Sequence, residues 1–247
     1  MTRLRWQLVL RARELGGRIP RGEIPRLLAG ELLAAQTEGF ARRGYAFFQD
    51  RKGALRLETA PRRLFAEEIS CELGTDLVGR RVETHWRVGS TNDIARERAR
   101  DGREGVAVFA EEQTHGRGRF GGRWHAPRFS SLLFSVPLHS RGGSIEPEGL
   151  MLAGAVAVAE AIREEAGLGA LIRWPNDVLL EDKKVSGVVV EGFGPPEDRW
   201  FIVGVGVNVN AKRLPPELQR EAASICDLLG RDADRVLLAR ADRKSVV

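Results

Sequence analysis

Hydrophobic positions near the N-terminus follow helical spacing and then alternate. Leucines recur at helical intervals over residues 4–15, and a pair of glycines predicts the end of that helix. Two further helices are predicted at residues 25–30, which begin with a proline, and 31–44, which end with a glycine. YAFFQ and ALRLET then flank the basic turn DRKG, so a hairpin is expected over residues 45–59. Three helices followed by a hairpin are typical of a winged helix-turn-helix.

The pattern changes from Val82 onward, where short β-prone runs alternate with longer helical segments. The runs are VAVFA, SLLFSVPL, VSGVVVEGF and RWFIVGVGVNV. Helices are predicted at residues 92–102 and 149–167. The second is apolar on nearly all sides between Met151 and Ala159, which predicts burial against a sheet and not a membrane span at that length. We therefore expect an α+β fold with a mixed or antiparallel sheet that carries helices.

Together these patterns divide the chain into three parts. The length of 247 residues suits one sizeable core and one small accessory domain. We expect a winged helix-turn-helix-like domain at residues 1–60, a linker helix at 61–80 and the α+β domain at 81–247.

Basic residues are concentrated in the first of these parts. Residues 1–70 contain 14 Arg and Lys against 8 Asp and Glu, whereas the rest contains 25 against 26. A basic domain is typical of nucleic-acid binding. The predicted third helix, however, carries Glu31 and Glu38 and no arginine before Arg42, and DNA phosphates favour the opposite charge. Two interpretations stay open. Either residues 1–60 bind operator DNA, or they form a small helical domain that binds protein or only packs.

Cysteine usage and hydropathy exclude several classes of protein. Cys71 and Cys226 lie far apart, and the four histidines show no ligand spacing, so we expect no disulfide framework and no metal site fixed by the protein alone. No apolar run reaches the roughly 18 residues that cross a bilayer, and the first residues do not read as a signal peptide. A cytoplasmic protein without a membrane partner is expected.

The segment HGRGRFGGRW, residues 115–124, carries glycines at the spacing of a dinucleotide loop. Such a loop requires a helix directly after it and an acid about 20 residues later. Here RWHAPRFSS follows, and residues 138–145 contain no carboxylate. The segment instead interleaves glycines with Arg117, Arg119 and Arg123 and ends at Trp124. Flexible backbone, cations and an aromatic plate predict a lid over an anionic ligand, with a basic surface loop as the alternative.

Two further motifs combine hydroxyl, amide and charged groups. GSTNDIA contains Ser90 and Thr91, either of which could simply cap the following helix. RWPNDVLLEDKKVSG places Asn176 and Asp177 ahead of a strand and turn that lead to Lys184. A hairpin tip would explain the charged turn by itself, but it would not explain the amide and carboxylate before the strand.

Taken in order, GSTND, EEQTHGRGRFGGRW, RWPNDVLLEDKKVSG and GVGVNVN resemble the biotin protein ligases over about residues 83–210. The N-terminal helices and hairpin look like the winged-helix domain of the bifunctional ligases that repress biotin operons. The resemblance implies the fold shared by class II aminoacyl-tRNA synthetases and biotin ligases.

The resemblance also implies a two-step acyl transfer that uses biotin, ATP and Mg²⁺. The biotin carboxylate attacks the α-phosphate and releases pyrophosphate, and a lysine on the biotin carboxyl carrier domain of acetyl-CoA carboxylase then attacks the biotinyl-adenylate. A carboxylate ~4 Å from a phosphate is repelled by about 4 kcal/mol at an effective dielectric near 20. Because that energy would slow the reaction roughly a thousandfold, local cations must cancel the repulsion.

Matching the motifs residue by residue gives the implied biotin site and catalytic groups. Arg117 and Arg119 would hold the carboxylate and phosphate, and Lys184 would stabilise the charge that develops. The ureido ring would be bound by Ser90, Thr91, Asn92 and Gln113. The remaining members of the implied set are Gly118 and Gly187 in the biotin site and Asp177 among the catalytic groups.

The implied nucleotide site uses the later parts of the same motifs. Trp124 would cover the adenine and Asn208 would read its edge. Arg119 and Arg123 would contact phosphate. Asn176, together with Asp177, would position the magnesium phosphate or the incoming lysine. We expect the lid to order only over its ligand, because its arginines would otherwise lack partners.

Two departures from the family pattern stand out. Gly122 stands where relatives carry an arginine, and Arg123 comes one residue late, which affects one phosphate contact. The chain also ends soon after the last motif, so we expect the catalytic domain to be truncated before a small C-terminal β-barrel. The alternatives are a DNA-binding biotin-sensing repressor, and a lipoate-protein ligase, which would not be expected to carry GRGR followed by a tryptophan. A homodimer stays open.

Overall fold

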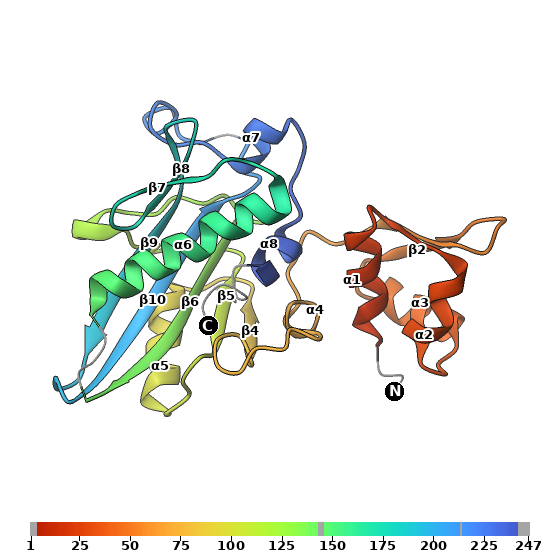
Figure 1. The fold of residues 1–247 in the computed structure, drawn as a ribbon, viewed down its shortest axis with the longest axis horizontal. Helices are drawn as coiled ribbons and strands as arrows, with labels where there is room; N and C mark the ends of the chain where they lie inside the picture. The colour runs from red at the N-terminus through yellow and green to blue at the C-terminus, as the bar shows by residue number, and fades with distance from the viewer. Residues whose placement is uncertain (1–3, 143–145, 213, 242–247) are drawn as a thin grey trace. The chain divides into compact units, whose positions relative to one another are not determined.

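The computed structural model describes residues 4–142, 146–212 and 214–241. It divides into two compact units, Met1–Glu72 and Leu73–Val247 (Figure 1). The boundary falls inside the segment 61–80, which was expected to form a linker helix. Within that segment the helix is confined to α4 (Ala66–Ser70), and Glu72 and Gly74 then adopt positive φ angles of 51° and 68° that a helix cannot continue through.

The first unit contains the predicted helices and hairpin. Its helices are α1 (Trp6–Glu14), α2 (Ile24–Leu28), α3 (Leu33–Ala41) and α4, with a 3-10 turn η1 (Arg21–Glu23) before α2. Its strands, β1 (Arg18–Ile19), β2 (Ala46–Gln49) and β3 (Leu55–Thr59), form an antiparallel sheet in the order β1-β3-β2.

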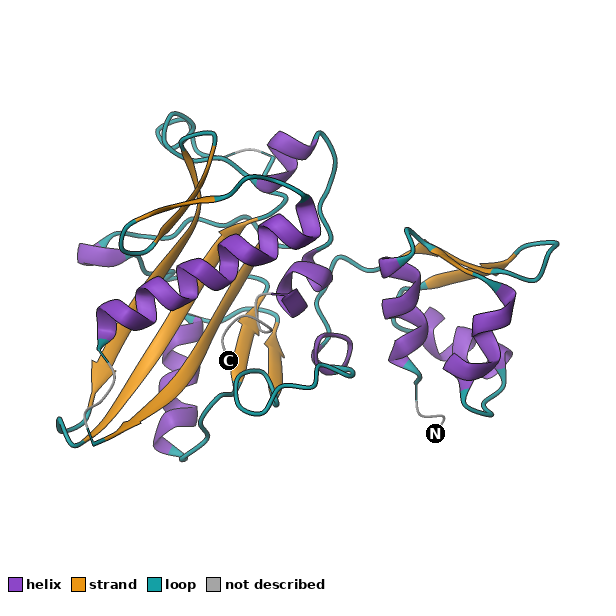
Figure 2. Cartoon of the chain, in the orientation of Figure 1, coloured by secondary structure: helices purple, strands orange, loops and turns teal. Residues whose placement is uncertain are grey.

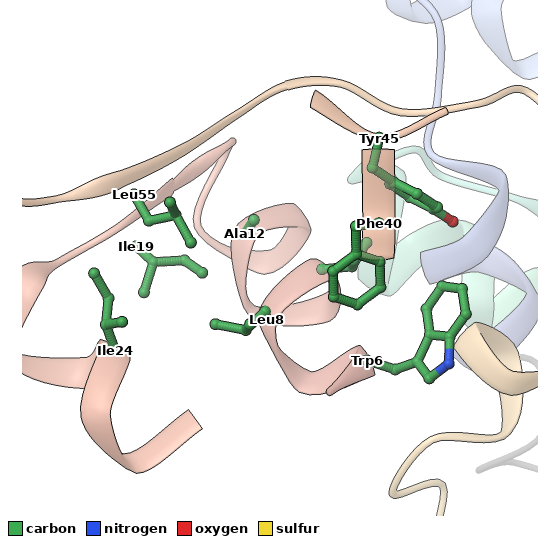
Figure 3. Close-up of a cluster of buried hydrophobic side chains, with 9 residues drawn as sticks. Trp6, Leu8, Ala12, Ile19, Ile24, Phe40, Tyr45 and Leu55 are labelled. Atoms are coloured by element: carbon green, nitrogen blue, oxygen red, sulfur yellow. The ribbon is translucent and has the colours of Figure 1, made fainter. Parts of the chain in front are cut away.

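Aromatic side chains hold this unit together (Figure 3). Trp6 packs edge-on against Phe40 and Tyr45, with ring centroids 5.2 and 5.9 Å apart. The hydroxyl of Tyr45 donates to the buried carboxylate of Glu68 at 2.6 Å, and Arg13 donates to the same carboxylate at 2.7 Å. Burial, followed by the Glu68 charge, raises the pKa of Tyr45. These bonds attach α4 to the aromatic core.

The second unit is built on one seven-stranded sheet (Figure 2). The strand order is β4-β5-β6-β10-β9-β8-β7. β4 and β5 are parallel and all other pairs are antiparallel, so the sheet is mixed, as predicted. The strands are β4 (Val82–His85), β5 (Ala107–Ala110), β6 (Ser131–Arg141), β7 (Leu171–Arg173), β8 (Asp177–Leu180), β9 (Lys183–Phe193) and β10 (Asp198–Asn208). The helical elements are α5 (Thr91–Arg100), η2 (Arg119–Gly121), α6 (Pro147–Ala166), α7 (Ile225–Leu229) and α8 (Arg235–Ala241).

The long apolar helix α6 lies across one face of the central strands (Figure 1). Its Gly154 approaches β9 so closely that a Cβ atom there would lie 3.1 Å from Val188. Side chains alternate along a strand, so Val188 faces α6 and Gly187 faces the opposite side. None of the helices in the described residues is long and apolar enough to span a membrane.

Candidate active site

Three glycines form a flat floor on the face of the sheet opposite α6. Gly187 of β9 is paired with Gly206 of β10, and Gly204 lies two residues away on the same face. A Cβ atom at Gly204 would lie 2.3 Å from Asn92 Oδ1, and one at Gly206 would lie 2.5 Å from the indole of Trp124. The absence of side chains at these positions is therefore what allows two predicted ligand-binding residues to lie directly against the sheet.

A cavity of about 330 Å³ opens above this floor. Small-molecule sites in proteins usually measure about 300–1,000 Å³. The three predicted motifs meet in its wall, since the lining includes Ser90, Thr91, Asn92, Gln113, Arg117, Gly118, Arg119, Arg123, Trp124, Asn176, Asp177, Lys184 and Gly187. The lining also contains residues that the sequence did not single out as ligand-binding: Phe120, Gly122, Val189, Gly204, Val205 and Gly206.

Hydroxyl and amide groups at the start of α5 form one side of the cavity. Ser90 caps the helix by accepting from the Asn92 backbone N–H at 3.3 Å, so the expected cap is confirmed in a residue that also lines the cavity. Gln113 Oε1 accepts from the Thr91 backbone N–H at 2.7 Å and from the Thr91 hydroxyl at 3.0 Å. Ser135 of β6 donates to Asn92 Oδ1 at 2.6 Å. These side chains are thus already oriented by one another.

The glycine-rich loop, residues 115–124, closes on itself beside the cavity. Gly118 donates to the Gly122 carbonyl at 2.7 Å, and Trp124 donates to the Gly116 carbonyl at 3.0 Å. Position 116 requires glycine, because a Cβ atom there would lie 2.6 Å from the Trp124 carbonyl oxygen. At the loop tip Phe120 has a φ of 53° and is 95% exposed.

The arginines of this loop have partners within the protein, so the expectation that they lack them was wrong. Arg117 pairs with Asp93 at 2.8 Å and with Glu191 at 2.9 Å. Arg119 donates to Asn176 Oδ1 at 2.8 Å. Burial lowers the pKa of Arg117, but its hydrogen bond to Asp93 and the Glu191 charge outweigh burial and raise it. Arg117 therefore has carboxylate partners, whereas the partner of Arg119 is a neutral amide.

Lys184 reaches the cavity from the first residues of β9. Its ammonium lies 2.6 Å from Asp177 Oδ1 and 5.8 Å from the ring centroid of Trp124. Arg173 binds the second oxygen of Asp177 at 2.8 Å. The neighbouring Lys183 is exposed. Lys184 and Trp124 consequently share one end of the cavity.

Asn208 does not belong to the cavity lining. It is buried at the end of β10, where its amide nitrogen donates to the Ala223 carbonyl at 3.2 Å. Among the described residues its Oδ1 has no hydrogen-bond partner, and the same is true of Trp124 Nε1. Both atoms are thus exceptions to the rule that buried polar atoms have a hydrogen-bond partner.

The two carboxylates that hold Arg117 were not predicted from the sequence. Asp93 stands within the GSTND motif, and Glu191 lies on β9 on the same face as Gly187. Their pairing with Arg117 depends on where the loop folds back over the sheet, and residue spacing does not encode that position.

The sequence matches the model of the biotin/lipoate A/B protein ligase family over residues 86–210. It is 34% identical over 203 residues to a protein named bifunctional ligase/repressor BirA from Bacillus subtilis, covering 80% of this chain and 62% of that protein. It is 33% identical to the biotin–[acetyl-CoA-carboxylase] ligase of Mycobacterium tuberculosis, covering 60% of this chain and 56% of that one. The chain therefore spans less than two thirds of the length of these curated relatives.

A solved structure has a similar fold. The biotin protein ligase of Aquifex aeolicus in complex with biotin and ATP superposes with a TM-score of 0.58 and 33% identity. The match covers 68% of this chain and 70% of the Aquifex chain. The mixed sheet with its helices is accordingly the fold of biotin protein ligase catalytic domains.

Proposed function

Because this chain belongs to the biotin/lipoate A/B protein ligase family, we propose that it activates biotin with ATP and transfers the biotinyl group to a lysine of a carboxylase carrier domain. One observation carries the proposal: hydroxyl and amide groups, cations and an aromatic plate from three separate motifs line a single cavity. Hydrogen-bonding groups suit the neutral end of biotin, and the cations suit the reaction between two anions.

The charge of the cavity supports the adenylation step. Its described lining contains four cations, Arg117, Arg119, Arg123 and Lys184, against the single carboxylate of Asp177. The carboxylate of Asp177 binds both Lys184 and Arg173. The hydrogen bond of Arg119 described above goes to the neutral amide of Asn176. Arg119 and Lys184 are therefore the groups that would offset repulsion between the carboxylate and the α-phosphate.

The start of α5 would bind the ureido ring of biotin. That ring offers one acceptor and two donors, each of which needs a partner once it is buried. Ser90 and Thr91 supply hydroxyls, and Asn92 and Gln113 supply amides, all in the same cavity. Because they already hydrogen-bond to one another, little side-chain entropy would be lost when biotin binds.

Trp124 and Asn208 would take the adenine. The indole of Trp124 lies against Gly206 and Gly187 of the glycine floor, and an adenine ring could stack on it. The buried Oδ1 of Asn208 could accept a hydrogen bond from the adenine amino group. Arg123 lines the same cavity and would approach the phosphates.

The Mg²⁺ that accompanies ATP would be bound together with the nucleotide. In the described part of the chain no group of three or more His, Cys, Asp or Glu residues is placed to hold a metal ion. Asp177 is already bound by two cations, and Asn176 is bound by Arg119. The ion would therefore be held mainly by the nucleotide phosphates, as is common for Mg²⁺.

In the second step the carrier lysine would enter beside Lys184 and Asp177. Asn176 and Asp177 line the cavity and could orient the incoming amine. The name of the Mycobacterium relative supports acetyl-CoA carboxylase as the acceptor. Homodimerisation stays a prediction.

Operator binding by residues 1–60 also stays a prediction. The name of the Bacillus relative supports it. The two acidic residues of the third predicted helix are paired within the unit, Glu31 with Arg5 and Glu38 with Arg42, which partly offsets their charge.

The proposed activity is tested by measuring pyrophosphate release with ATP and each of three acids: biotin, lipoate and octanoate. We expect release with biotin only, because the hydroxyl and amide network suits a ureido ring and would be left unpaired by an aliphatic acid. Release with lipoate or octanoate but not biotin would identify a lipoate-type ligase and reject the proposal.

A further inference from the structure

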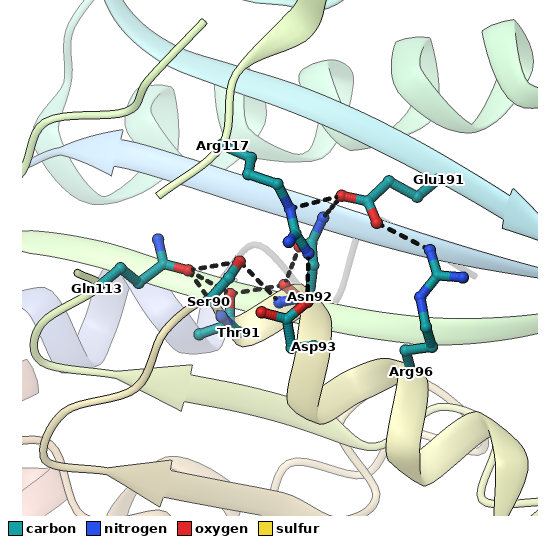
Figure 4. A network of polar contacts seen from close by, with 9 residues as sticks. Ser90, Thr91, Asn92, Asp93, Arg96, Gln113, Arg117 and Glu191 are labelled. Atoms are coloured by element: carbon teal, nitrogen blue, oxygen red, sulfur yellow. Dashed lines mark hydrogen bonds and ion pairs between the residues drawn. The ribbon is translucent and has the colours of Figure 1, made fainter. Parts of the chain in front are cut away.

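Glu191 joins three separate segments of the second unit through one carboxylate (Figure 4). It accepts from Asn92 Nδ2 at 2.7 Å, from Arg96 Nη2 at 2.9 Å and from Arg117 Nε at 2.9 Å. Asn92 and Arg96 belong to α5, Arg117 to the glycine-rich loop and Glu191 to β9. The carboxylate therefore connects the proposed biotin pocket with the loop that borders it.

A second carboxylate completes the contact. Asp93, in the first turn of α5, binds Arg117 Nη2 at 2.8 Å. Asp93 and Glu191 together balance the charges of Arg96 and Arg117. Arg117 is thus neutralised by the protein, so a ligand anion would have to compete with two carboxylates for it.

From this geometry we propose that Glu191 is a positioning residue that, with Asp93, latches the glycine-rich loop over the cavity through Arg117. The identity of the ligand in the cavity rests on the proposed function, but the latch itself does not. In this assignment Arg117 holds the loop in place, and Arg119 and Lys184 meet the substrate anions.

The other bonds of the loop explain why the latch is decisive. The backbone bonds from Gly118 and Trp124 lie within the loop, and the bond from His115 to the Gly89 carbonyl at 2.8 Å fixes only its first residue. Arg119 contacts a neutral amide, and Arg123 reaches the Thr114 carbonyl at 3.5 Å, the limit of a hydrogen bond. The Arg117 contacts differ from both, because opposite charges attract each other in addition to forming the hydrogen bond, whereas the Asn176 amide and the Thr114 carbonyl carry no net charge.

Glu191 also orients Asn92. The carboxylate accepts from Asn92 Nδ2, which turns Asn92 Oδ1 toward the Ser135 hydroxyl at 2.6 Å. Loss of the carboxylate would therefore loosen the loop and let the Asn92 amide rotate. Both changes reduce the fraction of molecules that are ready to bind ligand.

Limited trypsin digestion of the full chain without substrates tests the latch, because Arg117, Arg119 and Arg123 are cleavage sites inside the loop. Cleavage follows the population of the open segment when opening is fast. Glu191→Gln should raise the rate of cleavage after Arg119 by about tenfold. Cleavage at sites outside residues 115–124 should keep its wild-type rate.

Glu83→Gln is the matched control. Glu83 also accepts from an arginine of α5, Arg98, at 2.9 Å, but it lies on β4 outside the cavity lining. This variant should leave loop cleavage at the wild-type rate. The double variant Arg117→Gln/Glu191→Gln should be cleaved after Arg119 no faster than Arg117→Gln, because both changes break the same contact.

A wild-type cleavage rate in Glu191→Gln would overturn the latch, and so would an equal acceleration at every tryptic site. Steady-state kinetics add a second readout: Glu191→Gln should raise the KM for biotin about tenfold with a smaller change in kcat. If the wild-type chain releases no pyrophosphate with any acid, the proposed function fails, while digestion still decides the latch.

Discussion

Replacing Lys184 with alanine is expected to lower the rate of adenylate formation by up to about a thousandfold. The ammonium lines the cavity, 2.6 Å from Asp177 and beside Trp124. No other ammonium group is found in the described lining. Without it, Arg119 would be the only one of the two assigned cations left to offset the repulsion between a carboxylate and a phosphate, which is about 4 kcal/mol at ~4 Å and an effective dielectric near 20. Biotin-dependent pyrophosphate release measures the loss.

The neighbouring lysine provides the control for this prediction. Lys183 is exposed and does not line the cavity, so Lys183→Ala removes the same charge from the same strand. It should retain nearly wild-type activity. Equal activity of both variants would contradict the assigned role, and equal loss in both would point to the net charge of the strand instead.

Replacing Gly206 with alanine is expected to weaken ATP binding by about tenfold to a hundredfold. The new Cβ atom would lie 2.5 Å from Trp124 Cε2 and 2.8 Å from its Nε1, so the indole would have to leave the floor. Stacking of a base on an aromatic side chain is worth about 1–3 kcal/mol. The KM for ATP should rise while the KM for biotin changes little.

Two other glycines test whether this effect is local. Gly204→Ala would place a Cβ atom 2.3 Å from Asn92 Oδ1, so it should raise the KM for biotin more than that for ATP. Gly149→Ala, in α6, meets nothing within 4 Å and should affect neither constant. If Gly206→Ala and Gly204→Ala both raised the KM for ATP and the KM for biotin to the same extent, the substitutions would have distorted the sheet. That result would contradict the assignment of Gly206 to the ATP side of the floor and Gly204 to the biotin side.

Much of the fold follows from local sequence patterns. The apolar circumference of residues 151–159 predicts a helix buried on a sheet, and α6 is that helix. The β-prone runs after Val82 correspond to β5, β6, β9 and β10 of a mixed sheet. The extent of the linker helix was wrong, because positive φ angles at Glu72 and Gly74 end the helical path. A positive φ angle is uncommon for a residue other than glycine, so the sequence does not predict it at Glu72.

The sequence indicates some of the residues that line the cavity, but not how they pair with one another. Ser90, Arg119 and Lys184 stand in motifs that can be read from the sequence, and the structure brings them to one cavity. The contact between Arg117 and Glu191 joins residues 74 positions apart, which only the folded loop and sheet bring together. The need for glycine at positions 204 and 206 likewise cannot be predicted from the sequence, because it depends on the residues that pack against them in the fold.

In the proposed function, one cavity holds biotin and ATP so that the carboxylate meets the α-phosphate. Mass spectrometry of the small molecules retained by the full chain after incubation with biotin and ATP–Mg²⁺ tests it most directly. Biotinyl-5′-AMP should be retained by the wild-type chain, and Lys184→Ala should retain little or none. Recovery of unreacted biotin and ATP alone from the wild-type chain would mean that the two substrates do not react in this cavity.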